Sequence, residues 1–382
     1  MAIAEPLPES AGDVLDPETG GTLTIDLDAI GANWRMLVSR LLPVECAAVV
    51  KANAYGLGLE PITAKLAKAG CKTFFVADIA EARRVRTRTR EATIYVLNGF
   101  SPEAAGAFVT LKLQPVINSM TELAEWDAFT IANNWNGGAA IHVDTGMNRL
   151  GISATEAAAL APRAQSAKHG MTLLMSHLAC AEIANHPLNA SQLQLFRELR
   201  LLYHGIPASI ANSSGIFLSD SAHFDMARPG AALYGINPTP GQANPMRNVV
   251  ELNGRILQLR TVQPGETVGY GAAWTARRAA RVAVAAVGYA DGYLRAGSGT
   301  DGKSGGVVLV AGKRCPIVGR ISMDLTCIDI SELSDNAVHR GDVATFIGNE
   351  LPIDEVAASA GTISYEILTR LGPRCHLLYR GA

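Results

Sequence analysis

The chain of 382 residues is longer than one ordinary hydrophobic core requires, so we expect two domains or one large barrel with an addition. Hydrophobic residues make up 48% and charged residues 18%, which is typical of a folded protein and excludes a disordered one. The formal net charge of −2 and the lack of a basic stripe argue against nucleic acid as a partner, and no apolar run approaches the length of a membrane span.

The first twenty residues, Met1–Gly20, are rich in Asp, Glu, Pro and Gly. They lack the positive start and the apolar stretch of a signal peptide, so we expect a flexible tail. The six cysteines are scattered and form no Cys-x-x-Cys pair, which argues against a zinc site of the usual spacing, and we expect no bound metal. A chain of this length needs no disulfide framework, so we expect reduced thiols and a cytoplasmic protein.

Short apolar runs alternate with helical patterns through the first two thirds of the chain. Strands are expected at Cys46–Val50, Thr73–Val76, Thr93–Val96, Gln114–Val116, Ala140–Val143, Thr172–Met175, Ala208–Ala211 and Asp225–Arg228. Helices are expected at Pro61–Ala69, Ile79–Thr87, Ser119–Thr130, Ala154–Ala167 and Ala190–Tyr203. Such alternation requires crossover connections and therefore a parallel sheet. Eight units over roughly 200 residues fit a (β/α)8 TIM barrel. An open doubly wound sheet is the alternative, because counting strands does not separate the two.

After about Gly241 the pattern changes to alternation of period two. Strands are expected at Arg255–Val262, Arg281–Val287, Gly306–Val310 and Thr326–Ile330, with Pro-Gly, Asp-Gly and Ala-Gly turn signals between them. These features predict a mostly-β domain. We place the boundary in the loop Asn237–Asn248, which gives a barrel domain over 21–245 and a C-terminal β domain over 246–382.

Polar residues and one glycine stand where the expected barrel strands end. They are Lys51 after the first strand, Arg149 after the fifth, His177 after the sixth, Asn212 and Ser213 after the seventh, and Arg228 and Gly230 after the eighth. Taken singly, each is more often structural, as a solvated lysine, a core histidine or a turn glycine. Together they should collect at the C-terminal face, where barrel enzymes keep their sites and commonly hold phosphate after the last two strands. The pattern predicts a barrel enzyme with an anionic ligand and suggests a Schiff-base lysine.

Seven short motifs follow one another from the barrel into the β domain. They are Ala48–Gly56, His142–Gly151, Arg228–Gly235, Val268–Gly271, Gly288–Gly292, Gly319–Asp324 and Thr362–Glu366. They cover nearly the whole chain except the tail, and in order and spacing they resemble the motifs of the alanine racemases, which are pyridoxal-phosphate enzymes of fold type III. One such motif would be weak evidence, whereas seven in order are highly specific.

The resemblance implies a role for each matched position. Lys51 would bind pyridoxal 5′-phosphate as a Schiff base, Arg228 would face its pyridine nitrogen, and Arg149 would lie beside its phenolic oxygen. The full implied cofactor site is Lys51, Tyr55, Arg149, His177, Asn212, Ser213, Arg228, Gly230, Ala231 and Tyr365. The implied substrate site is Arg149, Tyr270, Tyr289, Arg320, Met323 and Asp324.

Racemisation needs two acid/base groups on opposite sides of a planar carbanion. The resemblance assigns these roles to Lys51 and to Tyr270, which would come from the partner subunit of a homodimer. Both side chains have unperturbed pKa values of about 10, so each pKa must be lowered for work near neutral pH. The implied reaction is the interconversion of L-alanine and D-alanine, which would supply D-alanine for peptidoglycan.

One position departs from the family pattern. Many alanine racemases carry a carbamylated lysine where this chain has His142, and that group orients the arginine matched here by Arg149. Histidine cannot carry a stable carbamate. Three possibilities follow: His142 itself holds Arg149, a bound anion holds it, or no group does.

Three other functions stay open. A pyridoxal-phosphate decarboxylase shares the barrel-plus-β plan, but keeps a glutamate at the pyridine nitrogen where this chain has Arg228. A non-catalytic pyridoxal-phosphate-binding barrel would lack the domain that carries Tyr270. A racemase of serine or of broad specificity is compatible with every motif, because a few residues change a side-chain pocket.

Overall fold

The computed structural model describes residues 15, 16, 18–164, 166, 170–372 and 374–381. The chain divides into two compact units. Residues 26–249, with the chain from Arg380 onward, form what we call the barrel unit. Residues up to Ile25 and Val250–Tyr379 form what we call the β unit.

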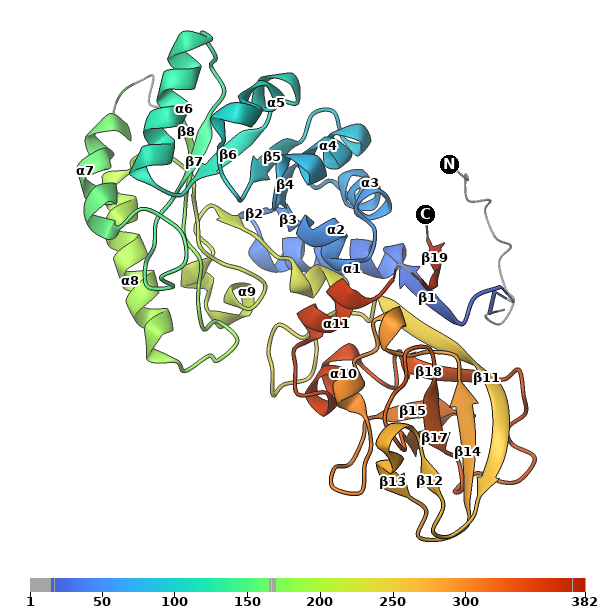
Figure 1. Cartoon of the computed structure of the whole chain (residues 1–382). Coiled ribbons are helices and arrows are strands. Elements are labelled where there is room, and N and C mark those ends of the chain that lie inside the picture. Colours follow the sequence, from blue (N-terminus) through green and yellow to red (C-terminus); the bar gives the residue numbers. More distant parts are fainter. Residues whose placement is uncertain (1–14, 17, 165, 167–169, 373, 382) are drawn as a thin grey trace. The chain divides into compact units, whose positions relative to one another are not determined.

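Parallel strands and helices alternate in the barrel unit (Figure 1). Seven strands pair in the order β3-β4-β5-β6-β7-β8-β9. The strands of the unit are β2 (Glu45–Cys46), β3 (Ala48–Val49), β4 (Thr73–Val76), β5 (Thr93–Val96), β6 (Gln114–Ile117), β7 (Ala139–His142), β8 (Met171–Met175), β9 (Ala208–Ser209) and β10 (Met226–Ala227). Its helices are α1 (Leu27–Leu41), α2 (Lys51–Tyr55), α3 (Leu59–Ala69), α4 (Ile79–Arg88), α5 (Ala105–Thr110), α6 (Met120–Ala132), α7 (Ala154–Ala164), α8 (Pro187–Leu202) and α9 (Gly215–Leu218).

Backbone hydrogen bonds close these strands into a ring. The eighth strand, β10, pairs in parallel with β2, and the Ala47 N–H donates to the Ala227 carbonyl at 3.0 Å. On its other side the Arg228 N–H donates to the Ala211 carbonyl at 2.9 Å, which joins β10 to the chain after β9. The (β/α)8 barrel is therefore confirmed, and the open doubly wound sheet is excluded. The expected strand Cys46–Val50 is interrupted between β2 and β3.

Local sequence explains where the helices around the barrel begin. The Asp78 carboxylate accepts the Glu81 N–H at 2.9 Å before α4, and the Ser119 hydroxyl accepts the Glu122 N–H at 3.1 Å before α6. These are N-cap bonds, which satisfy backbone donors that the first helical turn leaves unpaired. The strands are apolar runs, and all four residues of β4 are buried, as parallel strands covered by helices require.

The β unit is built on an eight-stranded sheet whose main path is β16-β15-β18-β11-β1-β19, with β14 joining β11 to β17. Its strands are β1 (Gly21–Asp26), β11 (Val250–Val262), β12 (Thr267–Val268), β13 (Trp274–Thr275), β14 (Ala280–Ala285), β15 (Val307–Val310), β16 (Lys313–Pro316), β17 (Thr326–Asp329), β18 (Val343–Ile347) and β19 (His376–Arg380). Two short helices, α10 (Ile353–Ser359) and α11 (Ser364–Arg370), accompany them. The expected mostly-β C-terminal domain is confirmed.

The N-terminal strand belongs to this sheet, although the expected barrel domain of 21–245 included it. β1 runs antiparallel to β11, with Leu23 opposite Leu252, and the side chains of Leu23 and Ile25 are fully buried. The physical reason is that β1 buries its apolar residues only by pairing with a strand more than 200 positions away. The chain from Arg380 onward returns to the barrel unit.

The expected flexible tail over Met1–Gly20 lies mostly outside the described residues. Its described end is held in place: Leu15 is buried, and the Arg255 guanidinium donates to the Leu15 carbonyl at 2.8 Å. Asp16 pairs with the His376 imidazole at 2.9 Å. The described part of the tail is thus attached to the β unit.

The described part of the chain has neither a membrane-spanning helix nor a metal-binding cluster. No helix there is both long and apolar enough to cross a membrane. No cluster of three His, Cys, Asp or Glu side chains there could bind a metal ion, and none of the six cysteines forms a disulfide.

Candidate active site

Lys51 begins a short turn with an unusual backbone. It follows β3, and the next four residues, Ala52 to Tyr55, all have left-handed backbone angles with φ between 54° and 57°. Non-glycine residues avoid this region, at a cost of roughly 1–2 kcal/mol each. Runs of this kind persist only where surrounding contacts hold them, and they concentrate at functional sites. This left-handed run is a stronger indication that Lys51 is a functional residue than its position after a strand.

The charge state of Lys51 is set by its neighbours in the barrel unit. Burial lowers the pKa of the Lys51 ammonium, and the positive charge of Arg149 lowers it further, while the Glu81 carboxylate acts in the opposite direction. A lysine amine with a lowered pKa is a better nucleophile and base near neutral pH.

Ser213, Gly230 and Tyr55 converge beside this turn. The Ser213 hydroxyl accepts the N–H groups of Gly230 and Ala232 at 3.0 and 3.1 Å. A Cβ atom at Gly230 would lie 2.3 Å from the Tyr55 hydroxyl oxygen, so any other residue there would displace the Tyr55 ring. Hydroxyls and backbone N–H groups gathered at a glycine are the donors that phosphate sites use.

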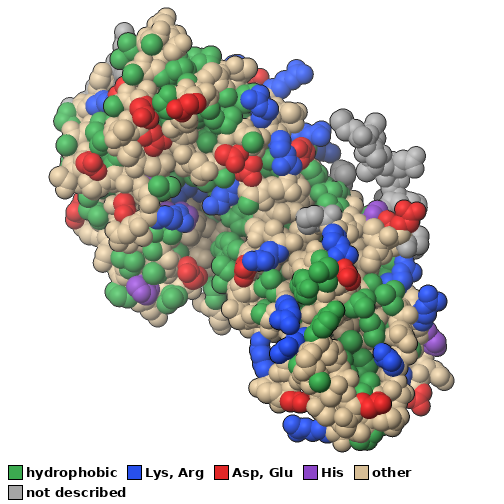
Figure 2. All heavy atoms as spheres, viewed as in Figure 1, with side chains coloured by type: hydrophobic (Ala, Val, Ile, Leu, Met, Phe, Trp, Pro, Cys, Tyr) green, Lys and Arg blue, Asp and Glu red, His purple; other side chains and the backbone are tan. Residues whose placement is uncertain are grey.

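Arg228 lies at the centre of the site as a buried cation. Its guanidinium donates to the Ser209 hydroxyl, to the Ser176 carbonyl at 2.5 Å and to His177 Nδ1 at 3.5 Å. Burial lowers the pKa of Arg228 to about 10, so it stays protonated at neutral pH. Figure 2 shows Lys or Arg and His side chains gathered around a hollow in the surface of the barrel unit.

His177 is neutral, because the Arg228 guanidinium can only donate a hydrogen bond. His177 Nδ1 must then be the acceptor, and the proton of the ring lies on Nε2. Burial, followed by the positive charges of Arg228 and Arg149, lowers the pKa of His177 to about 3.

His142 is a second neutral histidine, and its side chain is buried. The Asn118 side-chain amide donates to the carbonyls of Val116 and Leu97 at 2.7 and 3.2 Å, which directs its oxygen toward His142 Nδ1 at 2.7 Å. Nδ1 therefore carries the proton, and Nε2 is left as an acceptor. Burial, then the charges of Arg228 and Arg149, lowers the pKa of His142 to about 4.

Two expected barrel residues are placed less centrally. Arg149 is exposed on the loop after β7, and within the described residues it makes no hydrogen bond to His142. The Asp144 carboxylate shapes that loop by accepting the N–H groups of Gly146, Met147 and Asn148 at 2.8 to 2.9 Å. The Asn212 side chain accepts the Gly215 N–H at 2.9 Å, at the first residue of α9.

The β unit brings its own expected site residues together. Tyr270 lies in the turn between β12 and β13 with 67% of its surface exposed. A Cβ atom on the next residue, Gly271, would lie 2.7 Å from the Arg320 guanidinium. The Tyr289 N–H donates to the Ser322 carbonyl at 3.1 Å, which ties the second tyrosine to the same loop.

The other members of this group are also at the surface. Met323 is 52% exposed, and Tyr365, on α11, is 40% exposed. The Asp324 carboxylate pairs with Arg374 at 2.6 Å. Large exposed side chains on neighbouring loops are typical of residues that contact a partner or a ligand.

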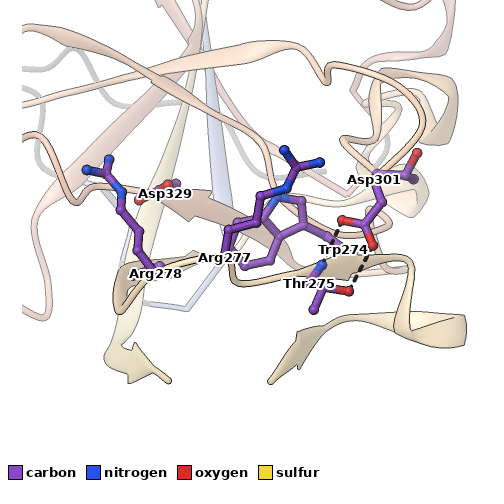
Figure 3. Close-up of a pocket in the computed structure, with 8 residues that line it drawn as sticks. Trp274, Thr275, Arg277, Arg278, Asp301 and Asp329 are labelled. Carbon is purple, nitrogen blue, oxygen red and sulfur yellow. Dashed lines mark hydrogen bonds between the residues drawn. The ribbon is translucent and has the colours of Figure 1, made fainter. Parts of the chain in front are cut away.

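The β unit also contains a pocket that is lined by other residues than the expected site residues. It is lined by Trp274, Thr275, Arg277, Arg278, Ala280, Thr300, Asp301 and Asp329 (Figure 3). The Asp301 carboxylate accepts from the Thr275 N–H at 2.9 Å and from its hydroxyl at 2.8 Å. None of the expected site residues lines this pocket.

Two family models match the chain in succession. The alanine racemase N-terminal domain covers residues 25–238, and the alanine racemase C-terminal domain covers residues 249–379. The chain belongs to the alanine racemase family. The predicted family and the predicted enzyme class are thereby confirmed.

Relatives of known name agree with this assignment. An alanine racemase of Methylobacterium nodulans is 50% identical over 355 residues, which are 93% of this chain and 95% of the relative. A catabolic alanine racemase of Mesorhizobium japonicum is 45% identical over 371 residues, or 96% of this chain and 95% of the relative. The crystal structure of the Bartonella henselae alanine racemase with covalently bound pyridoxal phosphate has a TM-score of 0.88 and 38% identity, covering 94% and 99% of the two chains.

Some residues of the candidate site were not among the expected ones. Ser176 and Ser209 hold the Arg228 guanidinium, and Asn118 fixes the His142 ring. Asn118 directly follows β6, so the rule that selected polar residues at strand ends would also have found it. The two serines stand at the ends of β8 and β9, but serine there carries no signal that distinguishes a buried guanidinium partner from a surface residue.

The lowered pKa of His142 makes the stability of the fold depend on pH. The unfolded chain binds a proton at His142 below about pH 6.5, whereas the folded chain does so only below about pH 4. Stability should therefore be lost as the pH falls through this window, by roughly 3 kcal/mol for this one group. His142→Gln keeps a donor for Asn118 but has no such titration, so we expect a smaller loss of unfolding free energy between pH 6.5 and 4.

Urea unfolding at several pH values measures this effect. His204→Gln, at an exposed histidine, is the matched control and should keep the pH dependence of the unaltered protein. An unchanged pH dependence in the His142 variant would show that this ring titrates alike in the folded and unfolded chains.

Proposed function

We propose that this chain interconverts L-alanine and D-alanine, with pyridoxal 5′-phosphate bound covalently through Lys51. The observation that carries the proposal is the strained left-handed turn at Lys51, which lies beside the Ser213–Gly230 cradle and the buried Arg228 guanidinium. The Bartonella relative, with its covalently bound cofactor, supports the same assignment.

The described residues fit this cofactor. Tyr55, Ser213, Gly230 and Ala231 offer hydroxyl and N–H donors for a phosphate group, to which we add Tyr365 of the β unit and Asn212 after β9. Arg228 offers a permanent donor for a ring nitrogen, and His177 stays neutral beside it. When bound, the cofactor supplies the electron sink that makes the α-proton of an amino acid acidic.

Lys51 and Tyr270 are the proposed bases. The Lys51 amine, with its lowered pKa, would hold the α-proton at Nζ on one face of the substrate. The Tyr270 phenol would hold or deliver a proton at its oxygen on the other face. We propose that Tyr270 comes from the partner subunit of a homodimer, for which its exposure in the β12–β13 turn is suitable.

The Met323 backbone amide would bind the substrate carboxylate. Arg149 would lie beside the substrate and the cofactor, and Tyr289, Arg320 and Asp324 would lie near the substrate or its entry path. These residues bind the part of the substrate that all amino acids share. A racemase of serine or of broad specificity is therefore the second candidate, because the motifs concern that common part.

We propose that the product D-alanine serves peptidoglycan synthesis in the cytoplasm. The relative from Mesorhizobium japonicum is named catabolic, so the opposite direction of use is the competing role. Deletion of the gene distinguishes them: a biosynthetic enzyme leaves cells dependent on added D-alanine, and a catabolic one leaves them unable to grow on alanine.

The enantiomer ratio of the product tests the reaction itself. Purified protein with added pyridoxal phosphate is incubated separately with L-alanine, L-serine and L-lysine, and carbon dioxide release is followed beside chirality. The proposal predicts that L-alanine reaches a one-to-one mixture fastest, without carbon dioxide. Faster conversion of serine or lysine, or release of carbon dioxide, would replace it with one of the alternatives.

A further inference from the structure

One carboxylate attaches the turn that carries Lys51 to α4 and to the end of β4. Glu81, the third residue of α4, accepts the Asn53 N–H at 2.9 Å through one oxygen and the Ala77 N–H at 2.9 Å through the other. Asn53 is in the middle of the left-handed run, and Ala77 directly follows β4. A single side chain thus links the strained turn to the end of the neighbouring strand.

The Asn53 side chain supplies a second attachment. Its oxygen accepts the Leu59 N–H at 3.1 Å and an Arg84 N–H at 2.7 Å. Arg84 is itself fixed by two hydrogen bonds to the Glu60 carboxylate, both at 2.6 Å. Arginine and glutamate in this forked arrangement hold the amide in one orientation.

These contacts offset a conformational cost that the local sequence does not reduce. The run contains two alanines, which gain nothing from the left-handed region, and Ala52 is exposed and therefore has no packing to hold it. Without outside bonds the turn would relax toward ordinary angles, and the Lys51 amine would be redirected because it begins the turn.

We propose that Glu81 is a positioning residue for the proposed cofactor lysine: it holds the left-handed turn through the Asn53 N–H and thereby aims Lys51 at the cofactor. This inference rests on the function proposed above for Lys51. It assigns to Glu81 a role in cofactor affinity, although the Glu81 side chain is not expected to touch the cofactor.

The barrel contains a matched control for this role. Glu122 is the third residue of α6, as Glu81 is of α4, and both follow an N-capping side chain. Glu122 accepts the Asn118 N–H at 2.7 Å, four residues earlier, and the Phe100 N–H in the loop after β5. The two glutamates make the same pair of bonds, but the Phe100 loop carries no expected site residue. The Asn118 group that Glu122 binds is the backbone N–H, whereas the Asn118 side chain faces His142.

The test compares Glu81→Gln with Glu122→Gln. Glutamine keeps the shape of the side chain but replaces one acceptor oxygen with a donor, so each variant loses one charged hydrogen bond. We expect both to lower the melting temperature of the cofactor-free protein by a similar few degrees. Only Glu81→Gln should weaken binding of pyridoxal phosphate, by roughly tenfold in Kd, measured by titration of the cofactor-free protein and followed by visible absorbance.

A rescue variant separates positioning from general damage. Glycine enters the left-handed region without steric cost, so Ala52→Gly added to Glu81→Gln should restore most of the lost affinity. If Glu81→Gln does not fold, Asn53→Ala removes the second attachment and should weaken cofactor binding in the same way.

The outcomes separate this inference from the proposed function. If borohydride treatment of the unaltered holoenzyme leaves no cofactor on Lys51, the proposed function fails. If Lys51 is labelled but Glu81→Gln, or Asn53→Ala in its place, binds pyridoxal phosphate as the unaltered protein does, the role of Glu81 is wrong. An equal loss of affinity in Glu122→Gln would likewise overturn it, because the effect would then be one of general stability.

Discussion

Replacing Lys51 with alanine is expected to lower kcat/KM for alanine racemisation by about 10⁴-fold in both directions. The variant loses both the covalent attachment of the cofactor and one of the two bases. The amine is also the group whose pKa the site lowers by burial and by the charge of Arg149. The measurement is a chiral assay started from each enantiomer with saturating pyridoxal phosphate.

The matched control is Lys68→Ala, which removes an exposed lysine from the last turn of α3. It should keep the activity of the unaltered protein. Adding a small amine such as methylamine to the Lys51 variant should restore part of the proton transfer. If Lys51→Ala retains more than a tenth of the activity, Lys51 is neither the attachment point nor a base.

Tyr270→Phe is expected to lower racemisation by roughly 10²- to 10³-fold, because the phenol that serves one face of the substrate is gone. The two enantiomers have equal free energy in solution, so the kcat/KM values for the two directions must fall by the same factor. The measurement is again the chiral assay, started once from L-alanine and once from D-alanine. Tyr379→Phe, outside the expected site, is the control and should leave both rates unchanged.

Exchange with deuterium oxide distinguishes a lost base from a damaged site. In Tyr270→Phe the Lys51 amine should still remove and return the α-proton on its own face. One enantiomer should therefore continue to exchange its α-hydrogen for deuterium with retention of configuration, while inversion is slow. Equal slowing of exchange in both enantiomers would contradict the assignment of Tyr270 as the second base.

The barrel could be predicted because each of its strands is a short buried run between helical patterns. The expected strand Thr73–Val76, for example, coincides with β4, because its apolar run lies between Lys72 and Asp78. The first strand was harder to delimit. It is split into β2 and β3, since it bonds to β10 at one end and to β4 at the other.

Elements whose stability comes from distant partners were missed. The sequence of β1 alternates, but nothing local indicates that its partner is β11. The seven-residue helices α10 and α11 follow a long region of alternating strands, where so short a helical pattern carries little signal. The helix α1 was also overlooked, although Asp26 caps its first turn by accepting the Ala29 N–H at 2.7 Å.

In the candidate site too, features set by the local sequence could be predicted, and features set by distant contacts could not. Lys51, Arg228 and His177 could be selected because they are polar residues at the ends of buried strands. The left-handed turn after Lys51 could not be predicted, because Ala52 and Ala54 give no local reason for positive φ. The Glu81 carboxylate on α4 accepts the Asn53 N–H in this turn, a contact that depends on the tertiary structure. The tautomer of His142, with its proton on Nδ1, likewise follows only from the orientation of the Asn118 amide.

Borohydride reduction followed by peptide mapping tests the attachment of the cofactor to Lys51 most directly. The purified protein is incubated with pyridoxal phosphate, reduced, digested and analysed by mass spectrometry, and racemase activity is measured in the same sample before reduction. We expect one phosphopyridoxyl group per chain, on the peptide that contains Lys51, and complete loss of activity after reduction. A racemase-active sample that carries the label on another lysine, or carries none, would contradict the account.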